Sequence, residues 1–117
     1  MALTHLVDIS VISRLGEPTV RAVVGPLTEE GRVGRAGITD LEVGYGSRNA
    51  REWHQDMADL SVFQLVETAE THLQRARQVQ RLLASRSQRG GKVPDLLIAA
   101  AAEQDHLILL HYDSDFD

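Results

Sequence analysis

The distribution of hydrophobic residues predicts strands that alternate with helices. Short apolar runs, which are typical of buried strands, occupy residues 3–8, 62–66 and 107–111, and residues 32–36 have the pattern of a brief, weak strand. Helical patterns occupy residues 18–31, 49–60, 68–88 and 92–102, and a further helix begins near Gly37. This alternation predicts an α/β fold with a mostly parallel sheet, and 117 residues suit one domain over residues 1–117.

The segment 92–102 is predicted to form a buried helix with a single carboxylate at its N-terminus. From Leu96 to Ala102 every residue is apolar, which predicts a helix inside the domain. Pro94 suits the first helical position, so Asp95 is expected in the first turn, beside the positive end of the helix dipole. The helix N-terminus, and Asp95 with it, would then face a cleft. Acids are also common in the first turns of helices for their interaction with the dipole alone. The other acids of the chain must decide between these interpretations.

Smaller patterns predict how other helices begin and pack. Ser10 is a candidate helix cap, with the turn beginning at Asp8 or Ile9. Thr39 and Glu42 have the Ser/Thr-x-x-Glu spacing of a capping box, and Gly44 and Gly46 leave room for close packing. The apolar residues expected to face the core are Val20, Val23, Val24 and Leu27 in one helix and Trp53, Met57 and Leu60 in another.

Four carboxylates are expected at one edge of the predicted sheet. Asp8 and Asp113 lie at the carboxyl ends of the first and last strands, and Glu42 and Asp95 are placed in the first turns of helices. In a right-handed βαβ arrangement these positions share the edge where ligands of parallel sheets bind. Like charges packed together are unfavourable without a cation, so the arrangement predicts a cation site. Glu42 alone would be explained equally well by the capping box.

The composition of the chain limits which ligands and partners it can bind. The net charge of −5 and the pI of about 5.5 argue against general binding to polyanions. The best local basic surface is the region 75–92, which is equally well explained as a solvated helix face. The absence of cysteine excludes disulfides, thiolate zinc sites and thiol nucleophiles. No histidine pair shares a short metal-binding spacing with an acid, so none of the histidines is expected to bind metal.

The sequence carries no pattern for membrane insertion or export. Residues 1–7 lack a basic region followed by a long apolar run. No segment approaches the roughly 18 apolar residues that a membrane span requires. Together with the absence of cysteine, this favours a soluble, cytoplasmic protein.

Four segments resemble the acidic motifs of PIN-domain ribonucleases, most closely those of VapC toxins. They are Val7-Asp8, residues 38–42, residues 92–100 and residues 110–117, and they follow the family's order along the whole chain. The most specific are Val-Pro-Asp-Leu at 93–96 and His-Tyr-Asp-x-Asp-Phe at 111–116. The resemblance assigns the catalytic and metal-binding quartet to Asp8, Glu42, Asp95 and Asp113, with Asp115 as a further candidate metal ligand. Ile9 departs from the pattern, because many members have Thr there.

The resemblance implies a three-layer α/β/α fold and a Mg²⁺- or Mn²⁺-dependent endoribonuclease. Carboxylate ligands independently favour such hard cations. The family's activity would be cleavage of a translation-related RNA, restrained by a cognate VapB-like antitoxin, by a toxin that generally forms homodimers. Family members usually continue beyond the fourth motif through a helix and an edge strand, so the sheet here is expected to lack its last edge strand.

Other classes fit the acidic residues less well. A PIN-fold module that binds RNA or protein without cutting is the main alternative, and the intact quartet counts against it. A phosphoacceptor receiver domain would need adjacent acids at the first strand and a Lys after the last. A calcium loop starting at Asp113 would need a later Gly and a terminal Glu.

Overall fold

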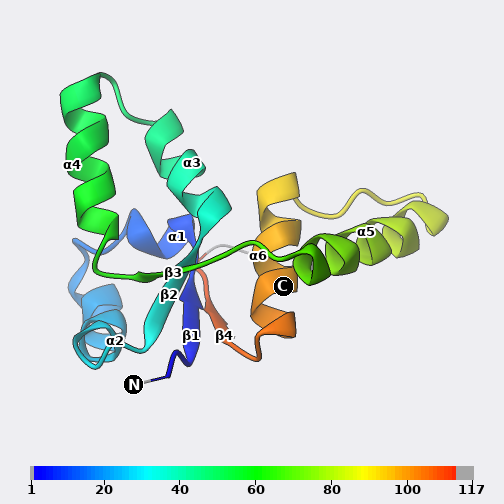
Figure 1. Ribbon diagram of the computed structural model, residues 1–117, viewed down its shortest axis with the longest axis horizontal. Coiled ribbons are helices and arrows are strands. Elements are labelled where there is room, and N and C mark those ends of the chain that lie inside the picture. The colour runs from blue at the N-terminus through cyan, green and yellow to red at the C-terminus, as the bar shows by residue number, and fades with distance from the viewer. Residues whose placement is uncertain (1, 113–117) are drawn as a thin grey trace.

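The computed structural model describes residues 2–112 and contains four strands and six helices in that range (Figure 1). In chain order they are β1 (His5–Val7), α1 (Ile9–Ile12), α2 (Pro18–Glu29), β2 (Val33–Ala36), α3 (Gly37–Tyr45), α4 (Ala50–Leu60), β3 (Gln64–Val66), α5 (Glu70–Ser85), α6 (Val93–Gln104) and β4 (Ile108–Leu110). Each predicted strand is present, although shorter than its apolar run. The predicted helices are present as well, and α1 adds a single turn after Asp8.

The sheet is entirely parallel, with strand order β3-β2-β1-β4. Strand β1 is central, and Leu6 lies opposite Gly34 of β2 on one side and Leu109 of β4 on the other. Strand β4 is an edge strand, since no other strand within residues 2–112 pairs with its outer side. Asp8 therefore follows an inner strand, and its backbone N–H donates to the carbonyl of Leu110 at 3.0 Å.

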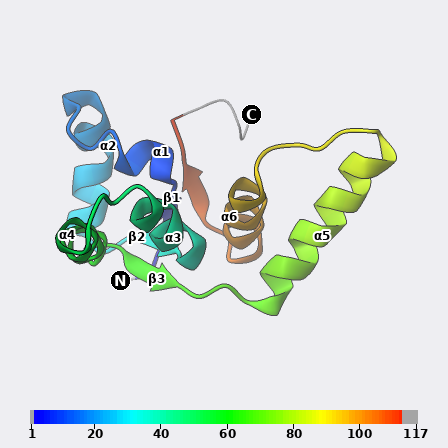
Figure 2. The ribbon, with the colours of Figure 1, turned by 90° about the horizontal axis from the view of Figure 1, so that it is seen from above.

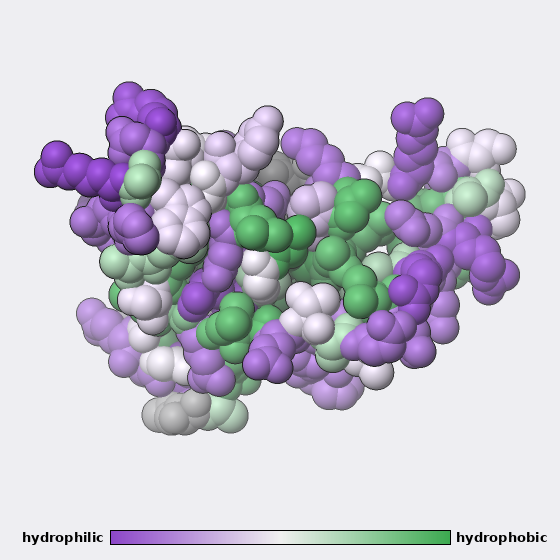
Figure 3. Space-filling model, turned by 45° about the horizontal axis from the view of Figure 1, so that its top comes forward, coloured by the Kyte–Doolittle hydropathy of each residue, from purple (hydrophilic) through white to green (hydrophobic). Residues whose placement is uncertain are grey.

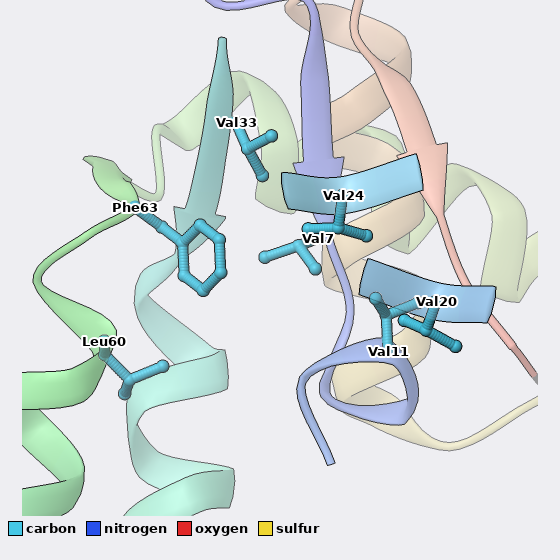
Figure 4. Close-up of a cluster of buried hydrophobic side chains, with 7 residues drawn as sticks. All are labelled: Val7, Val11, Val20, Val24, Val33, Leu60 and Phe63. Atoms are coloured by element: carbon cyan, nitrogen blue, oxygen red, sulfur yellow. The ribbon is translucent and has the colours of Figure 1, made fainter. Parts of the chain in front are cut away.

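Helices cover both faces of the sheet, which confirms the predicted three-layer fold (Figure 2). Successive residues of β1 point to opposite faces, so Val7 and Leu6, both fully buried, belong to different core clusters. The cluster on the α1, α2 and α4 side consists of Val7, Val11, Val20, Val24, Val33, Leu60 and Phe63 (Figure 4). The cluster on the α6 side consists of Leu6, Ala36, Ile98, Ala101 and Ala102, and α5 packs outside α6.

Several local predictions were wrong. Asp8, not Ser10, caps α1, because the chain turns directly at the end of β1. The capping box of Thr39 does not form, since α3 starts immediately after β2 with Ala36 as its N-cap. Glu42 is consequently in the second turn of α3, while Asp95 is in the first turn of α6 as predicted.

The prediction that Val23 faces the core was wrong, and the prediction that Gly44 allows close packing was confirmed. Val23 is 57% exposed, because it lines a surface cavity beside the edge strand β4 that no element within residues 2–112 fills. Gly44, in contrast, allows α3 and α4 to approach closely, since a Cβ at this position would lie 2.7 Å from Nε1 of Trp53. Trp53 packs on the backbone of α3 but is 43% exposed, so the prediction that it faces the core was wrong, whereas Leu60 is buried as predicted.

Candidate active site

Asp8 is the most deeply buried of the three described carboxylates of the predicted quartet. Its side chain is 1% exposed at the carboxyl end of the central strand β1. One oxygen, Oδ2, accepts the backbone N–H of Ser10 at 3.0 Å and so caps α1. The other, Oδ1, is buried and has no hydrogen-bond partner among residues 2–112. Because buried carboxylate oxygens are normally satisfied, this oxygen is suited to a ligand that residues 2–112 do not supply.

Helix α3 brings a second carboxylate to the same edge of the sheet. Glu42 is partly buried, and its Oε1 has no hydrogen-bond partner among the described residues. Burial, reinforced by the charges of Asp8 and Asp95, raises the pKa of Glu42 from its usual 4.5 to about 7, with Lys92 acting in the opposite direction. The carboxyl group therefore lies within electrostatic reach of both aspartates, as the predicted convergence requires.

Asp95 reaches the same site from α6. It is the third residue of that helix, after Pro94, and it is partly buried. The first turn of a helix stabilises a carboxylate through the helix dipole, so Asp95 is placed where its negative charge is tolerated. Lys92, the N-cap residue of α6, adds a positive charge at the rim. The structure thus brings three of the four predicted acids to one place.

The fourth predicted acid, Asp113, and the further candidate Asp115 lie outside the described residues. The chain immediately before them is held beside α1, because the backbone N–H of Tyr112 donates to Oγ of Ser10 at 3.0 Å. The roles of Asp113 and Asp115 therefore stay predictions from the resemblance.

The chemistry of the described acids fits a hard divalent cation. They offer only carboxylate oxygens, and buried oxygens of Asp8 and Glu42 lack protein donors within residues 2–112. The same residues contain no group of three or more His, Asp or Glu side chains arranged to hold a metal ion. Asp8, Glu42 and Asp95 therefore form a shared electrostatic site rather than a complete cation cage within the described part of the chain.

Thr39 is a neighbour of the site that the sequence patterns misassigned. It lies one turn before Glu42 on α3 and is fully buried. Its Oγ1 has no hydrogen-bond partner among residues 2–112. The Thr-x-x-Glu spacing of Thr39 and Glu42 does not form a helix cap. It places both side chains on the same face of α3.

The predicted basic surface is less basic than the sequence indicates. Arg75 forms an ion pair with Glu103 at 2.7 Å and Arg77 with Glu70 at 2.6 Å, so two arginines of α5 are neutralised. The basic residues of this region without an ion pair in the described part of the chain are Arg81, Arg86, Arg89 and Lys92. Hydrophilic side chains line the outer part of α5, at the right of Figure 3.

Two polar networks, one around the buried His72 and one around the partly buried Arg35, stabilise the elements around the site. His72 is 2% exposed and joins the backbone N–H of Ala69 to Oδ1 of Asp105. Arg35 of β2 binds both carboxylate oxygens of Asp40 and also donates to backbone carbonyls in the α4–β3 connection. The bonds of His72 to Asp105 and of Arg35 to Phe63 were not predicted, because these partners are 33 and 28 residues apart in the chain.

None of the helices within residues 2–112 has the length and apolar character to span a membrane.

Comparison with known families and structures agrees with this fold. The family model "PIN domain" matches residues 6–117. A DNA-bound VapBC from Salmonella typhimurium has a TM-score of 0.79 at 19% identity, over 97% of this chain and 90% of that chain. FitAcB from Neisseria gonorrhoeae has a TM-score of 0.72 at 26% identity, over 99% of this chain and 91% of that chain. The chain therefore belongs to the PIN-domain family.

Its sequence relatives define the branch of that family. Ribonuclease VapC51 of Mycobacterium tuberculosis (strain ATCC 25618 / H37Rv) is 59% identical over 117 residues, which are 100% of this chain and 85% of the relative. Ribonuclease VapC21 of the same strain is 38% identical over 120 residues, covering 100% of this chain and 86% of the relative. The chain is accordingly a member of the VapC family.

Proposed function

We propose that this protein is a metal-dependent endoribonuclease toxin whose active site contains Asp8, Glu42, Asp95 and Asp113. The observation that carries the proposal is that Asp8, Glu42 and Asp95 lie within electrostatic reach of one another in a PIN fold. The 59% identity to a protein named as a ribonuclease supports the reaction type. A single domain over residues 1–117 would carry the whole site.

We assign the carboxylates different roles because their surroundings differ. Asp8 and Asp95 are the proposed cation ligands, with Asp113 and Asp115 completing the set. Glu42, whose pKa is about 7, is the group best placed to gain or lose a proton near neutral pH, so we assign it to positioning the attacking water or to a second cation. When bound, Mg²⁺ or Mn²⁺ would neutralise the scissile phosphate and lower the pKa of the water.

The proposed partners are an RNA substrate and a VapB-like antitoxin. Several structural neighbours are VapBC assemblies, which supports a protein partner of that class. We propose that the RNA belongs to the translation machinery, that the protein acts in the cytoplasm and that it forms a homodimer. The unneutralised basic residues between Arg81 and Lys92 would contact the RNA backbone.

Substitution of Asp95 by Asn tests metal catalysis at this site. Asp95→Asn preserves the shape of the side chain but removes the charge that holds a cation, so we expect RNA cleavage to be lost while the fold is retained. Cleavage of labelled RNA in Mg²⁺, Mn²⁺ or excess chelator, together with a thermal melt, is the measurement. Asp59→Asn, at an exposed position on α4, is the matched control and should cleave like the wild type.

Two results would contradict the proposal. Equal cleavage by Asp95→Asn, or by the wild type in excess chelator, would exclude metal catalysis by this cleft. Wild-type protein that binds RNA but cuts it with neither metal would instead support the alternative of a catalytically silent PIN-fold module.

A further inference from the structure

The connection between α3 and α4 carries exposed aromatic side chains next to arginines. Tyr45, the last residue of α3, is 94% exposed, and Trp53, near the start of α4, is 43% exposed. Arg48 and Arg51 lie between them in the sequence and are exposed as well. Single exposed apolar residues are common on protein surfaces, so the position and charge of this surface decide whether it has a ligand.

This surface lies beyond the edge of the sheet that carries the proposed active site. Helix α3 starts directly after β2 and carries Glu42 in its second turn, and the connection to α4 lies at its far end (Figure 1). Tyr45 follows Glu42 by three residues, and residues at this spacing are neighbours on a helix surface, with about 5–6 Å between their Cβ atoms. A base that stacks on Tyr45 would therefore belong to a nucleotide close to the acids.

Trp53 is held in a fixed orientation, which suits a flat ligand. The indole packs on the backbone of α3, where a Cβ at Gly44 would lie 2.7 Å from Nε1. The ring of His54 meets the indole edge-on, with 5.1 Å between the ring centroids and an angle of 83° between the planes. Because the indole is already ordered, little conformational entropy is lost when a base stacks on it.

The arginines make this surface complementary to a nucleic acid. Residues 43–51 contain two arginines and no acid. Arg48 forms an ion pair with Glu52 at 3.1 Å, whereas Arg51 has no ion pair among residues 2–112. Aromatic rings beside positive charge are the arrangement that binds single-stranded nucleic acids, since bases stack on the rings and phosphates bind the charges. A duplex fits such a surface less well, because its bases are already stacked on one another.

We propose that Tyr45, Trp53 and Arg51 bind unpaired nucleotides of the RNA substrate next to Glu42, with bases on the aromatic rings and a phosphate on the arginine. They are binding residues and take no part in the cleavage step. The inference rests on the proposed ribonuclease function and adds that the RNA is single-stranded at this position. Loss of one stacking ring weakens nucleic-acid binding by about 5- to 140-fold in Kd, and we expect a loss in this range for Tyr45→Ala.

A second copy of the chain packed on the same surface is the competing explanation, and Leu41 is the matched control for it. Leu41 is 70% exposed one turn before Tyr45 on α3, so it would share a protein interface but has no ring for a base. Tyr45→Phe retains the ring, whereas Tyr45→Ala and Leu41→Ala each remove apolar surface. Arg48→Gln, which breaks the ion pair with Glu52, is the matched control for Arg51→Gln.

RNA binding is measured in excess chelator, so that cleavage does not interfere, with a mixed-sequence single strand and the same strand annealed to its complement. Trp53 is the only tryptophan of the chain, so its emission should be quenched by the single strand and little changed by the duplex. Tyr45→Ala should bind the single strand about 5- to 140-fold more weakly, whereas Tyr45→Phe and Leu41→Ala should bind it like the wild type. Arg51→Gln should reduce the slope of log affinity against log salt by about 0.7, and Arg48→Gln should reduce it less.

The outcomes distinguish this binding site from the proposed function. Tyr45→Ala that is folded in a thermal melt and binds the single strand like the wild type would overturn the site, and so would equal quenching of Trp53 by the duplex. The quenching comparison uses the wild type, so it decides even if Tyr45→Ala does not fold. Equal losses for Tyr45→Ala and Leu41→Ala, with a lower mass in light scattering, would assign the surface to a second copy and overturn the site. Wild-type protein that binds the single strand with quenching but cleaves it with neither Mg²⁺ nor Mn²⁺ would overturn the proposed function alone.

Discussion

Glu42 should lower the free energy of unfolding of the metal-free protein as the pH rises from 4.5 to about 7. Folding raises its pKa from 4.5 to about 7, so the folded state binds the proton more tightly than the unfolded chain does. Below pH 4.5 the group is protonated in both states and has no effect. Between pH 4.5 and about 7 the unfolded chain releases the proton first, and the free energy of unfolding falls until both states are ionised.

The size of the effect follows from the same pKa difference. The change from 4.5 to about 7 sets an upper limit of about 3 kcal/mol, since a tenfold change in proton affinity is worth about 1.4 kcal/mol. Glu42 is only partly buried, and solvent screening reduces the expected loss to about 1–2 kcal/mol. Glu42→Gln removes the charge, so it should be more stable than wild type by about this amount at pH 8 and by little at pH 4.5.

Urea unfolding in chelator at pH 4.5 and pH 8 measures this difference. Glu29→Gln is a suitable control, because Glu29 is an exposed glutamate on α2 with no ion pair among the described residues. At pH 8, excess Mn²⁺ should stabilise the wild type, since a ligand at a hundredfold excess over its Kd stabilises the native state by about 2.7 kcal/mol. A stability difference between Glu42→Gln and wild type that does not change with pH would refute the coupling of Glu42 to Asp8 and Asp95.

Three further predictions concern packing, RNA binding and self-association. Gly44→Ala should destabilise the fold by about 1–3 kcal/mol and alter Trp53 fluorescence, because the new methyl group overlaps the indole; unchanged emission and urea midpoint would contradict this. Arg81→Gln should weaken RNA binding and reduce the salt dependence of binding by about one phosphate contact. Arg77→Gln, which breaks only the ion pair with Glu70, should weaken RNA binding less, and equal losses of affinity in filter binding would exclude a specific role for Arg81. Ile108, 62% exposed on an edge strand, should promote association at high salt, and light scattering that Ile108→Lys leaves unchanged would show that β4 is not responsible.

Sequence patterns predicted the places of Asp8 and Asp95 in the fold, because local signals and topology agreed there. Asp8 ends an apolar run that can only be a buried strand, and Asp95 follows a proline that marks a helix start, so each was located by its immediate neighbours. The parallel topology then brought them to one edge. Glu42 was placed at the correct edge with an incorrect cap, because nothing in Thr39 or Glu42 reveals that α3 begins without a loop after β2.

Contacts between distant residues could not be predicted in this way. The arginines of α5 resembled a basic face until the fold brought Glu103 to Arg75, 28 residues away. The bond between Ser10 and Tyr112 spans 102 residues and depends on the carbonyl of Asp8 being occupied by α1. Periodicity describes which face a residue occupies but does not identify the polar group opposite it.

In the proposed site, the two oxygens of Asp8 have different consequences when this residue is substituted. Oδ2 caps α1, while the buried Oδ1 has no donor among residues 2–112. Asn caps helices as well as Asp does, so Asp8→Asn would remove the charge and leave a folded chain. Asp8→Ala would also remove the cap, at a cost of about 1 kcal/mol. Lineages that retain the fold as a binding module after losing catalysis should therefore carry asparagine at this position more often than alanine.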